Sequence, residues 1–158
     1  MTEYINITVI IPAINFSDYL NKCLKTIFSI SVDIKIILIC DKKSNQLHEL
    51  KLRYRNLKII FSDAYMNISQ KRNLGVKNAK TKYIAFIDSD AYPDKNWIKN
   101  SLKILNNNKQ IFLVGGPNIS PLNQNYQKQI IGEVQKSFLI TGKWSFQKFK
   151  SKSRFCKN

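Results

Sequence analysis

The chain has 158 residues, a formal net charge of +16, 44% hydrophobic residues and 23% charged residues. This length suits a single domain with a sizeable core, and the composition is ordinary for a globular protein. No apolar run reaches the roughly 18 residues that span a bilayer, which excludes a transmembrane helix at the level of sequence.

The large positive charge favours anionic partners: phosphate-bearing ligands, acidic membrane surfaces or nucleic acid. Compositional drift is the competing explanation, because Lys, Asn and Ile are abundant along the whole chain. The first residues, 1–4, lack the basic start of a secretory signal. Cys23, Cys40 and Cys156 have no metal-ligand spacing and cannot all pair, which predicts reduced thiols in the cytoplasm.

Apolar, β-branched runs alternate with helical patterns along the chain. The predicted strands are 5–11, 34–40, 57–61, 83–88 and 111–114. The predicted helices are 17–29, 45–55, 69–79, 94–106 and 125–138, with Ser17, Ser69 and Asp94 as N-caps. Continuous apolar strands with helical crossovers predict an α/β fold with a mostly parallel sheet covered on both faces.

Two acids close the fourth predicted strand, 83–88. If the extended backbone continues, Asp88 and Asp90 share a side about 6.6 Å apart. Their repulsion is about 2.5 kcal/mol at an effective dielectric of 20, and a divalent cation would relieve it. A simple turn is the alternative, since Asp and Ser are common in turns.

Three predicted strands end in acid or amide groups, at Asn15, Asp41 and Asp88. In open α/β sheets, ligands bind beyond the carboxyl ends of the strands. Helix capping does not require these residues, because Asp41 and Asp88 each precede the next helix by several positions. The coincidence favours a functional site over the turn.

A cluster of carboxylates at a sheet edge needs positive charge to offset it. Mg²⁺ or Mn²⁺ could supply this charge, because both ions prefer oxygen ligands and often keep phosphate oxygens in their shell. Lys71 and Arg72, near the start of the third predicted helix, are another source. A nucleoside diphosphate would use all of these groups together, whereas a solvated helix face is the alternative for the two basic residues.

These residues also form a known pattern. The segments 9–15, 72–75 and 83–90, with Asp41 between the first two, resemble the family 2 glycosyltransferases, which have the GT-A fold and use nucleotide sugars. The pattern is a strand ending in Pro-x-x-Asn, an acid after the second strand, an Arg-Asn-x-Gly helix and a strand ending in Asp-x-Asp. The resemblance covers about residues 5–120 and implies a GT-A-like, Rossmann-like nucleotide-binding half.

The resemblance also implies roles for single residues. Pro12 and Asn15 would line the nucleotide pocket, and Asp41 would contact the uracil or ribose. Arg72 would lie near the base or phosphates, and Lys71, chosen above as a cation for the diphosphate, is a further candidate nucleotide-sugar-binding residue.

The Asp-x-Asp end of the fourth strand would hold the rest of the donor. Asp88 and Ser89 would face the ribose and sugar of a UDP- or GDP-sugar, and Asp90 would ligate Mg²⁺ or Mn²⁺ together with Asp88. The implied reaction moves the sugar to an acceptor hydroxyl on a saccharide or lipid-linked acceptor, in cell-surface polysaccharide or glycolipid synthesis.

Two departures from the family pattern matter. The loop 42–45 reads Lys-Lys-Ser-Asn in place of an acidic, Gly-Ser-rich turn. No general base is identified, because Glu133 is the one acid after Asp94 and lies in a predicted helix. We therefore expect the chain to be an amino-terminal portion of such an enzyme, with a nucleotide-sugar-binding domain at 1–140.

Two other readings stay open. The chain could be a truncated, catalytically inactive nucleotide-sugar-binding module, or a basic nucleic-acid-binding protein, although the latter does not account for acids at three strand ends. The basic and aromatic tail at 141–158 could begin a truncated acceptor region, fray, or contact an anionic membrane. The expected location is the cytoplasm, with peripheral contact at the inner face of the membrane.

Overall fold

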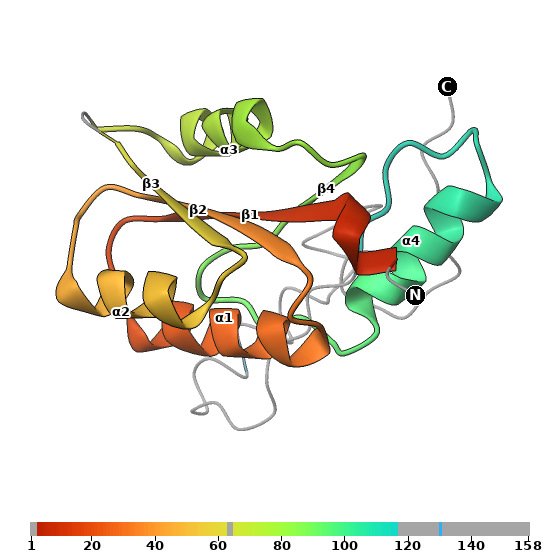
Figure 1. The fold of residues 1–158 in the computed structure, drawn as a ribbon. Coiled ribbons are helices and arrows are strands. Elements are labelled where there is room, and N and C mark those ends of the chain that lie inside the picture. Colours follow the sequence, from red (N-terminus) through yellow and green to blue (C-terminus); the bar gives the residue numbers. More distant parts are fainter. Residues whose placement is uncertain (1–2, 63–64, 117–129, 131–158) are drawn as a thin grey trace. The chain divides into compact units, whose positions relative to one another are not determined.

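A four-stranded parallel sheet is the centre of residues 1–98 (Figure 1). The computed structural model describes residues 3–62, 65–116 and 130, and the chain divides into two units, 1–98 and 99–158. The sheet has the order β3-β2-β1-β4, with β1 (Ile7–Ala13), β2 (Lys35–Cys40), β3 (Leu57–Phe61) and β4 (Tyr83–Phe86). A 3₁₀ turn, η1 (Glu3–Asn6), precedes β1. The predicted α/β fold with a mostly parallel sheet is confirmed.

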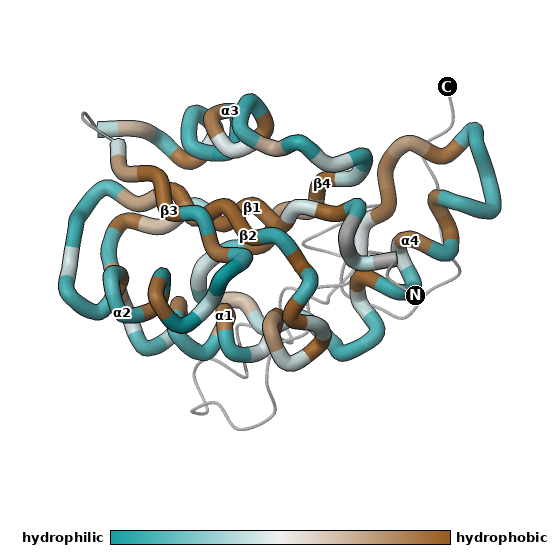
Figure 2. Tube along the Cα trace, viewed as in Figure 1, coloured by the Kyte–Doolittle hydropathy of each residue, from teal (hydrophilic) through white to brown (hydrophobic). Residues whose placement is uncertain are grey.

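Helices cover both faces of this sheet. Figure 1 shows α1 (Asp18–Ile30) and α2 (Asn45–Arg53) on one face and α3 (Ile68–Asn78) on the other. All seven residues of β1 are buried, as expected for a central strand covered on both sides. The sheet is the most hydrophobic part of the trace in Figure 2, whereas the helices alternate between apolar and polar residues. The fourth helix, α4 (Trp97–Asn107), spans the division between the two units.

The helix starts test the predicted caps. Ser17 is confirmed, because its Oγ accepts a hydrogen bond from the Leu20 N–H at 3.1 Å. Ser69 is wrong: Asn67 caps α3 through a reciprocal capping box with Gln70. Asp94 closes the turn that leads into α4, because its carboxylate accepts from the Asn96 N–H and its carbonyl accepts from the N–H of Trp97, the first residue of the helix.

The strand predicted at 111–114 is wrong. Residues 111–116 form no strand in the described part of the chain. Ile111 is buried, but Phe112 and Leu113 are 70% and 65% exposed. An apolar run becomes a strand only where a neighbouring strand satisfies its backbone, and among the described residues none pairs with it.

Pro12 is the penultimate residue of β1, although we predicted that the strand stops before it. The Ile10 carbonyl accepts from the Ile87 N–H at 3.3 Å, so every second residue of β1 turns its backbone groups toward β4. Pro12 faces the same way, but β4 pairs with β1 only up to Ile10. The missing N–H of the proline therefore removes no ladder bond.

Gly75 lets α3 lie directly against the sheet. A Cβ at this position would be 2.4 Å from Ile10 Cγ2 and 3.1 Å from Ile39 Cδ1. These two isoleucines belong to a buried cluster with Ile37, against which Leu74 of the same helix packs. The small residue at 75 thus fixes the distance between α3 and the sheet.

We expect Gly75→Ala to destabilise the fold by roughly 1–3 kcal/mol, because overpacking outweighs the gain in helix propensity. Urea denaturation measures the change in the free energy of unfolding. Gly115→Ala is the matched control: a Cβ there meets no atom within 4 Å, so its effect should stay within about 0.5 kcal/mol. Equal stability of the two variants would contradict the close packing.

None of the helices in the described ranges combines the length and the apolar character needed to cross a membrane. The helix predicted at 125–138, Glu133 within it, and the domain boundary at 140/141 with its basic tail lie outside the described residues, except for the single residue 130.

Candidate functional site

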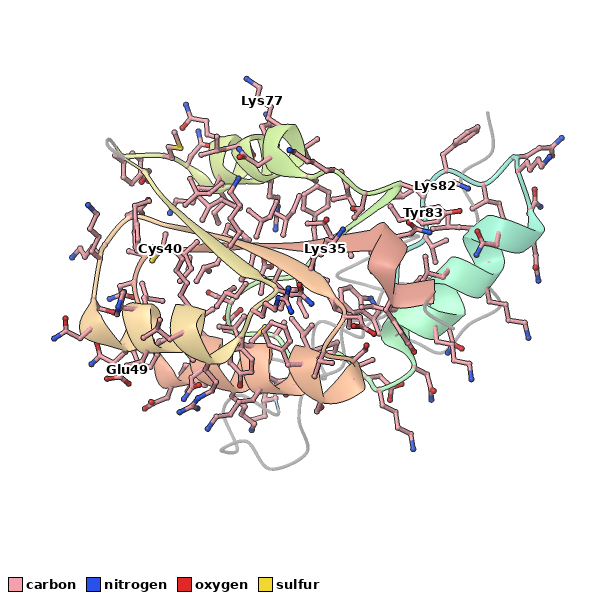
Figure 3. All side chains as sticks on the ribbon, viewed as in Figure 1. Lys35, Cys40, Glu49, Lys77, Lys82 and Tyr83 are labelled. Carbon is pink, nitrogen blue, oxygen red and sulfur yellow. The ribbon has the colours of Figure 1, made fainter. Side chains whose placement is uncertain are left out.

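The carboxyl ends of the strands form the edge at which polar side chains meet. Cys40, the last residue of β2, lies toward the opposite end of the sheet from Lys35, its first residue (Figure 3). The connection from β1 to β2 passes through α1 on one face, and the connection from β3 to β4 passes through α3 on the other (Figure 1). The order therefore reverses beside β1, which is where open α/β sheets bind ligands.

Lys71 joins the ends of three strands. It is only 3% exposed, and its Nζ donates to the Ala13 carbonyl at 2.7 Å and to Asp41 Oδ2 at 2.6 Å. The other carboxylate oxygen of Asp41 accepts from Ser62 Oγ at 2.8 Å. Ala13 ends β1, Asp41 follows β2 and Ser62 follows β3. A solvated helix face, the alternative for Lys71, is wrong.

This network keeps Asp41 charged. The hydrogen bond from Lys71 lowers the pKa of the Asp41 carboxyl below its ordinary value, and the bond from Ser62 lowers it further, while burial acts in the opposite direction. An ionised carboxylate accepts hydrogen bonds but cannot donate them, and 17% of the Asp41 side chain remains exposed. The group can therefore accept a hydrogen bond from a ligand that approaches the sheet edge.

Arg72, the next residue of α3, pairs with the second acid site. Its Nη2 lies 2.7 Å from Asp88 Oδ1, and the two side chains are 37% and 59% exposed. An ion pair this exposed contributes little to stability, about 1 kcal/mol at most. The Arg72 Nε is buried and has no hydrogen-bond partner among the described residues, whereas 37% of the side chain as a whole is exposed.

The backbone after β4 differs from the prediction. The strand ends at Phe86, and the Ala91 N–H donates to the Asp88 carbonyl at 3.1 Å, which closes a turn over 88–91. The assumption that an extended strand places both acids on one side is therefore wrong, because the chain has already turned. Asp88 thus belongs both to the turn over 88–91 and to the ion pair with Arg72.

Cys23 of α1 contacts the turn that carries both acids. Its Sγ donates to the Asp88 carbonyl at 3.8 Å. Burial, together with the charges of Asp90 and Asp88, raises the pKa of the Cys23 thiol to about 12, so the group stays a neutral thiol. Two negative charges thus act on the same buried atom.

The Asp90 carboxylate is available for a ligand. In residues 3–62 and 65–116 it makes no hydrogen bond or ion pair, and Asp88 uses only one of its oxygens for Arg72. No group of three or more His, Cys, Asp or Glu side chains gathers in the described part of the chain. Mg²⁺ and Mn²⁺ are commonly held by one or two carboxylates with phosphate oxygens completing the shell, so the residues present fit such an ion.

The structure thus brings the predicted residues together in two groups, Asp41 with Lys71 and Asp88 with Arg72. Asn15 is exposed in the loop after β1 and makes no hydrogen bond to either group. Ser89 lies half-buried within the turn between the two acids. Pro12 is buried in β1, beside the point where β4 separates from it.

Sequence reasoning missed Ser62 as a partner of Asp41. The rule that selected Asp41 could have found it, since Ser62 directly follows the third strand.

The sequence matches the model of glycosyl transferase family 2 over residues 8–157. The chain belongs to this family. The family resemblance inferred from the motifs is confirmed, and the family 2 match extends beyond the segments that carry those motifs.

Relatives of this family 2 chain are longer proteins. A dolichyl N-acetyl-α-D-glucosaminyl phosphate 3-β-D-2,3-diacetamido-2,3-dideoxy-β-D-glucuronosyltransferase from Methanococcus voltae is 30% identical over 153 residues, which cover 86% of this chain and 46% of the relative. Glycosyltransferase GlyA from Streptococcus pneumoniae is 30% identical over 103 residues, or 61% of this chain and 14% of the relative. The chain therefore spans less than half the length of either protein.

The fold of this family 2 chain is also similar to that of a solved structure. Staphylococcus aureus TarS 1–349, in a complex with UDP-GlcNAc, superposes with a TM-score of 0.63 at 20% identity, over 75% of this chain and 36% of the TarS chain. The likeness confirms the GT-A-like fold expected from the resemblance.

Proposed function

We propose that this chain binds a nucleotide-diphosphate sugar, a UDP- or GDP-sugar, at the carboxyl edge of its sheet and acts in a metal-dependent glycosyltransferase. The observation that carries the proposal is the arrangement at this edge of a family 2 chain: a charged Asp41 held by Lys71, an Arg72–Asp88 pair, and an Asp90 that pairs with no described residue. The TarS structure was solved with UDP-GlcNAc, which supports the donor class.

In this proposal each group binds one part of the donor. Asp41 accepts hydrogen bonds from the base or ribose, with Pro12 and Asn15 beside it. Arg72 donates to the diphosphate or base through the exposed part of its guanidinium, since 37% of the side chain is exposed.

The sugar end of the donor meets the turn after β4. Asp88 and Ser89 face the ribose and sugar, and Asp90, with Asp88, holds Mg²⁺ or Mn²⁺. When bound, the ion would offset the negative charge of the departing diphosphate.

The transfer itself forms one bond and breaks one. The acceptor hydroxyl oxygen attacks the anomeric carbon, and the bond from that carbon to the diphosphate oxygen breaks with its electron pair leaving on the nucleoside diphosphate. The acceptor proton must pass to a general base. Among the described residues after Asp90, Asp94 is the one acid, and its carboxylate already accepts from the Asn96 N–H.

A binding module without turnover is therefore a second candidate. The observation that favours it is the lack of an assigned base within the described residues. We further propose an acceptor that is a saccharide or lipid-linked saccharide of cell-surface polysaccharide or glycolipid synthesis, and a cytoplasmic location with peripheral contact at an anionic membrane, which suits the net charge of +16.

Calorimetry with the full chain tests the proposal. UDP or GDP should bind in the presence of Mn²⁺, and chelation of the metal should weaken binding at least roughly tenfold, because the diphosphate loses its counter-charge. The proposal would be refuted if neither UDP nor GDP binds. Release of UDP from a UDP-sugar in the presence of acceptor then separates an enzyme from a binding module.

A further inference from the structure

Lys71 has a feature that the proposed function does not explain: it is a buried cation placed behind an acid of the site. Only 4% of its side chain is exposed, against 17% of the Asp41 side chain. A buried ammonium without partners would be costly, and here the Ala13 carbonyl and Asp41 Oδ2 satisfy two of its three N–H groups. The lysine thus lies on the protein side of the carboxylate.

Asp41 is constrained from two directions. Lys71 binds one carboxylate oxygen and Ser62 binds the other, so the plane of the group is fixed by two bonds that come from different elements. The Asp41 and Lys42 N–H groups also donate to the Ile14 carbonyl, at 3.2 and 3.1 Å, which anchors the backbone that carries the acid. Little freedom is left for the carboxylate to reorient when a ligand arrives.

We infer that Lys71 is a positioning residue of the nucleotide site, which acts through Asp41 by fixing its carboxylate as a charged, oriented hydrogen-bond acceptor for the base or ribose. This inference rests on the proposed function. A charged acceptor of this kind prefers a ligand edge that carries N–H or O–H donors, such as the imide N–H of uracil. Lys71 itself stays behind the carboxylate.

The charged groups around Asp41 set the expected pH dependence. Lys71 of α3 and Lys42 of the same loop lower the pKa of Asp41, and the neighbouring Cys40 thiol, whose own pKa is raised chiefly by burial, stays neutral. With Lys71 present, Asp41 remains charged as the pH falls toward its lowered pKa. Without Lys71, the pKa-raising effect of burial on Asp41 is less strongly opposed, so the carboxylate takes up its proton at a higher pH.

The test is UDP binding by the full chain and its Lys71→Met variant, measured by calorimetry with Mn²⁺ from pH 7.5 to 4.5. We expect Lys71→Met to raise the Kd for UDP roughly 10-fold to 100-fold at neutral pH, the range of one charge-assisted hydrogen bond. The ratio of the variant Kd to the wild-type Kd should grow further as the pH falls. Because protonation of UDP changes both Kd values equally, it cancels in this ratio. A purely structural lysine would not produce this pH-dependent ratio.

Lys58→Met is the matched control. Lys58 also links the sheet to α3, through a 2.8 Å bond from its Nζ to Asn78 Oδ1, but it is exposed and lies away from Asp41. Its Kd for UDP should remain within about threefold of wild type at every pH.

The outcomes separate the two proposals. If the wild-type chain does not bind UDP or GDP, the proposed function fails. If it binds and folded Lys71→Met keeps the wild-type Kd and pH profile, only the positioning role fails. Should Lys71→Met not fold, Lys71→Gln keeps a donor without the charge and is expected to show the same pH-dependent ratio. If neither variant folds, Lys71 is a structural residue and the inference is overturned.

Discussion

Asp90→Ala is expected to lower the affinity for UDP in the presence of Mn²⁺ at least roughly tenfold, as much as removal of the ion by chelation does. The reason is that Asp90 has no hydrogen bond or ion pair to any described residue, so its carboxylate is free for an ion, whereas Asp88 is shared with Arg72. The fold should not suffer, because the side chain is exposed and forms no hydrogen bond or ion pair with a described residue. Calorimetry with and without Mn²⁺ measures the loss, and chelation should no longer weaken binding by the variant.

Asp33→Ala is the control for Asp90→Ala. It removes the same charge from the loop before β2, at the amino edge of the sheet. We expect its affinity for UDP to match the wild type. If Asp90→Ala still binds UDP in a Mn²⁺-dependent way, Asp90 is not a ligand of the ion.

Asp41→Asn is expected to have the largest effect on stability, a loss of about 3 kcal/mol in the free energy of unfolding at pH 7. The amide cannot neutralise Lys71, which would remain a buried and unpaired ammonium. Denaturation in urea measures the loss. Lys71→Met should cost less, because the carboxylate left behind is partly exposed and keeps its bond from Ser62.

The pH dependence of stability gives Asp41→Asn a second signature. The pKa of Asp41 is lowered in the folded chain, so its contribution is present above the unfolded pKa of about 3.9 and is lost as the pH falls through the folded value. The difference in stability between wild type and Asp41→Asn should therefore shrink in acid. Exposed Glu49→Gln is the control, and a gap that stays constant down to the acid limit would contradict the role of the ion pair.

Much of the fold follows from local pattern. The third strand and the Ser17 cap occur where hydrophobic periodicity and capping chemistry predict them. The cap of α3 was also readable, because Asn67 and Gln70 have the spacing of a capping box, but Ser69 competed as a capping residue type. The run at 111–114 has the composition of a strand, but it forms none, because no strand among the described residues pairs with it.

The site was less accessible to sequence reasoning. The rule that ligands bind at strand ends selected Asp41 and Asp88, and the structure places both acids after the carboxyl ends of parallel strands. It could not assign Lys71 to the interior. A lysine in an amphipathic pattern is normally placed on the outer face, and the inner face of α3 is poor in large apolar residues because Gly75 occupies it. The partner of each cation depends on tertiary contacts that no local pattern encodes.

The adjacency of Lys71 and Arg72 has a consequence for how this site could diversify. Neighbouring residues of a helix point about 100° apart with a rise of about 1.5 Å, so one peptide link separates the group behind Asp41 from the group beside Asp88. No insertion can alter that spacing without disrupting α3, whose Gly75 fixes it against the sheet. In the proposed site, substitution at 41 and 71 would therefore change the base preference without changing the spacing between the Lys71–Asp41 and Arg72–Asp88 pairs.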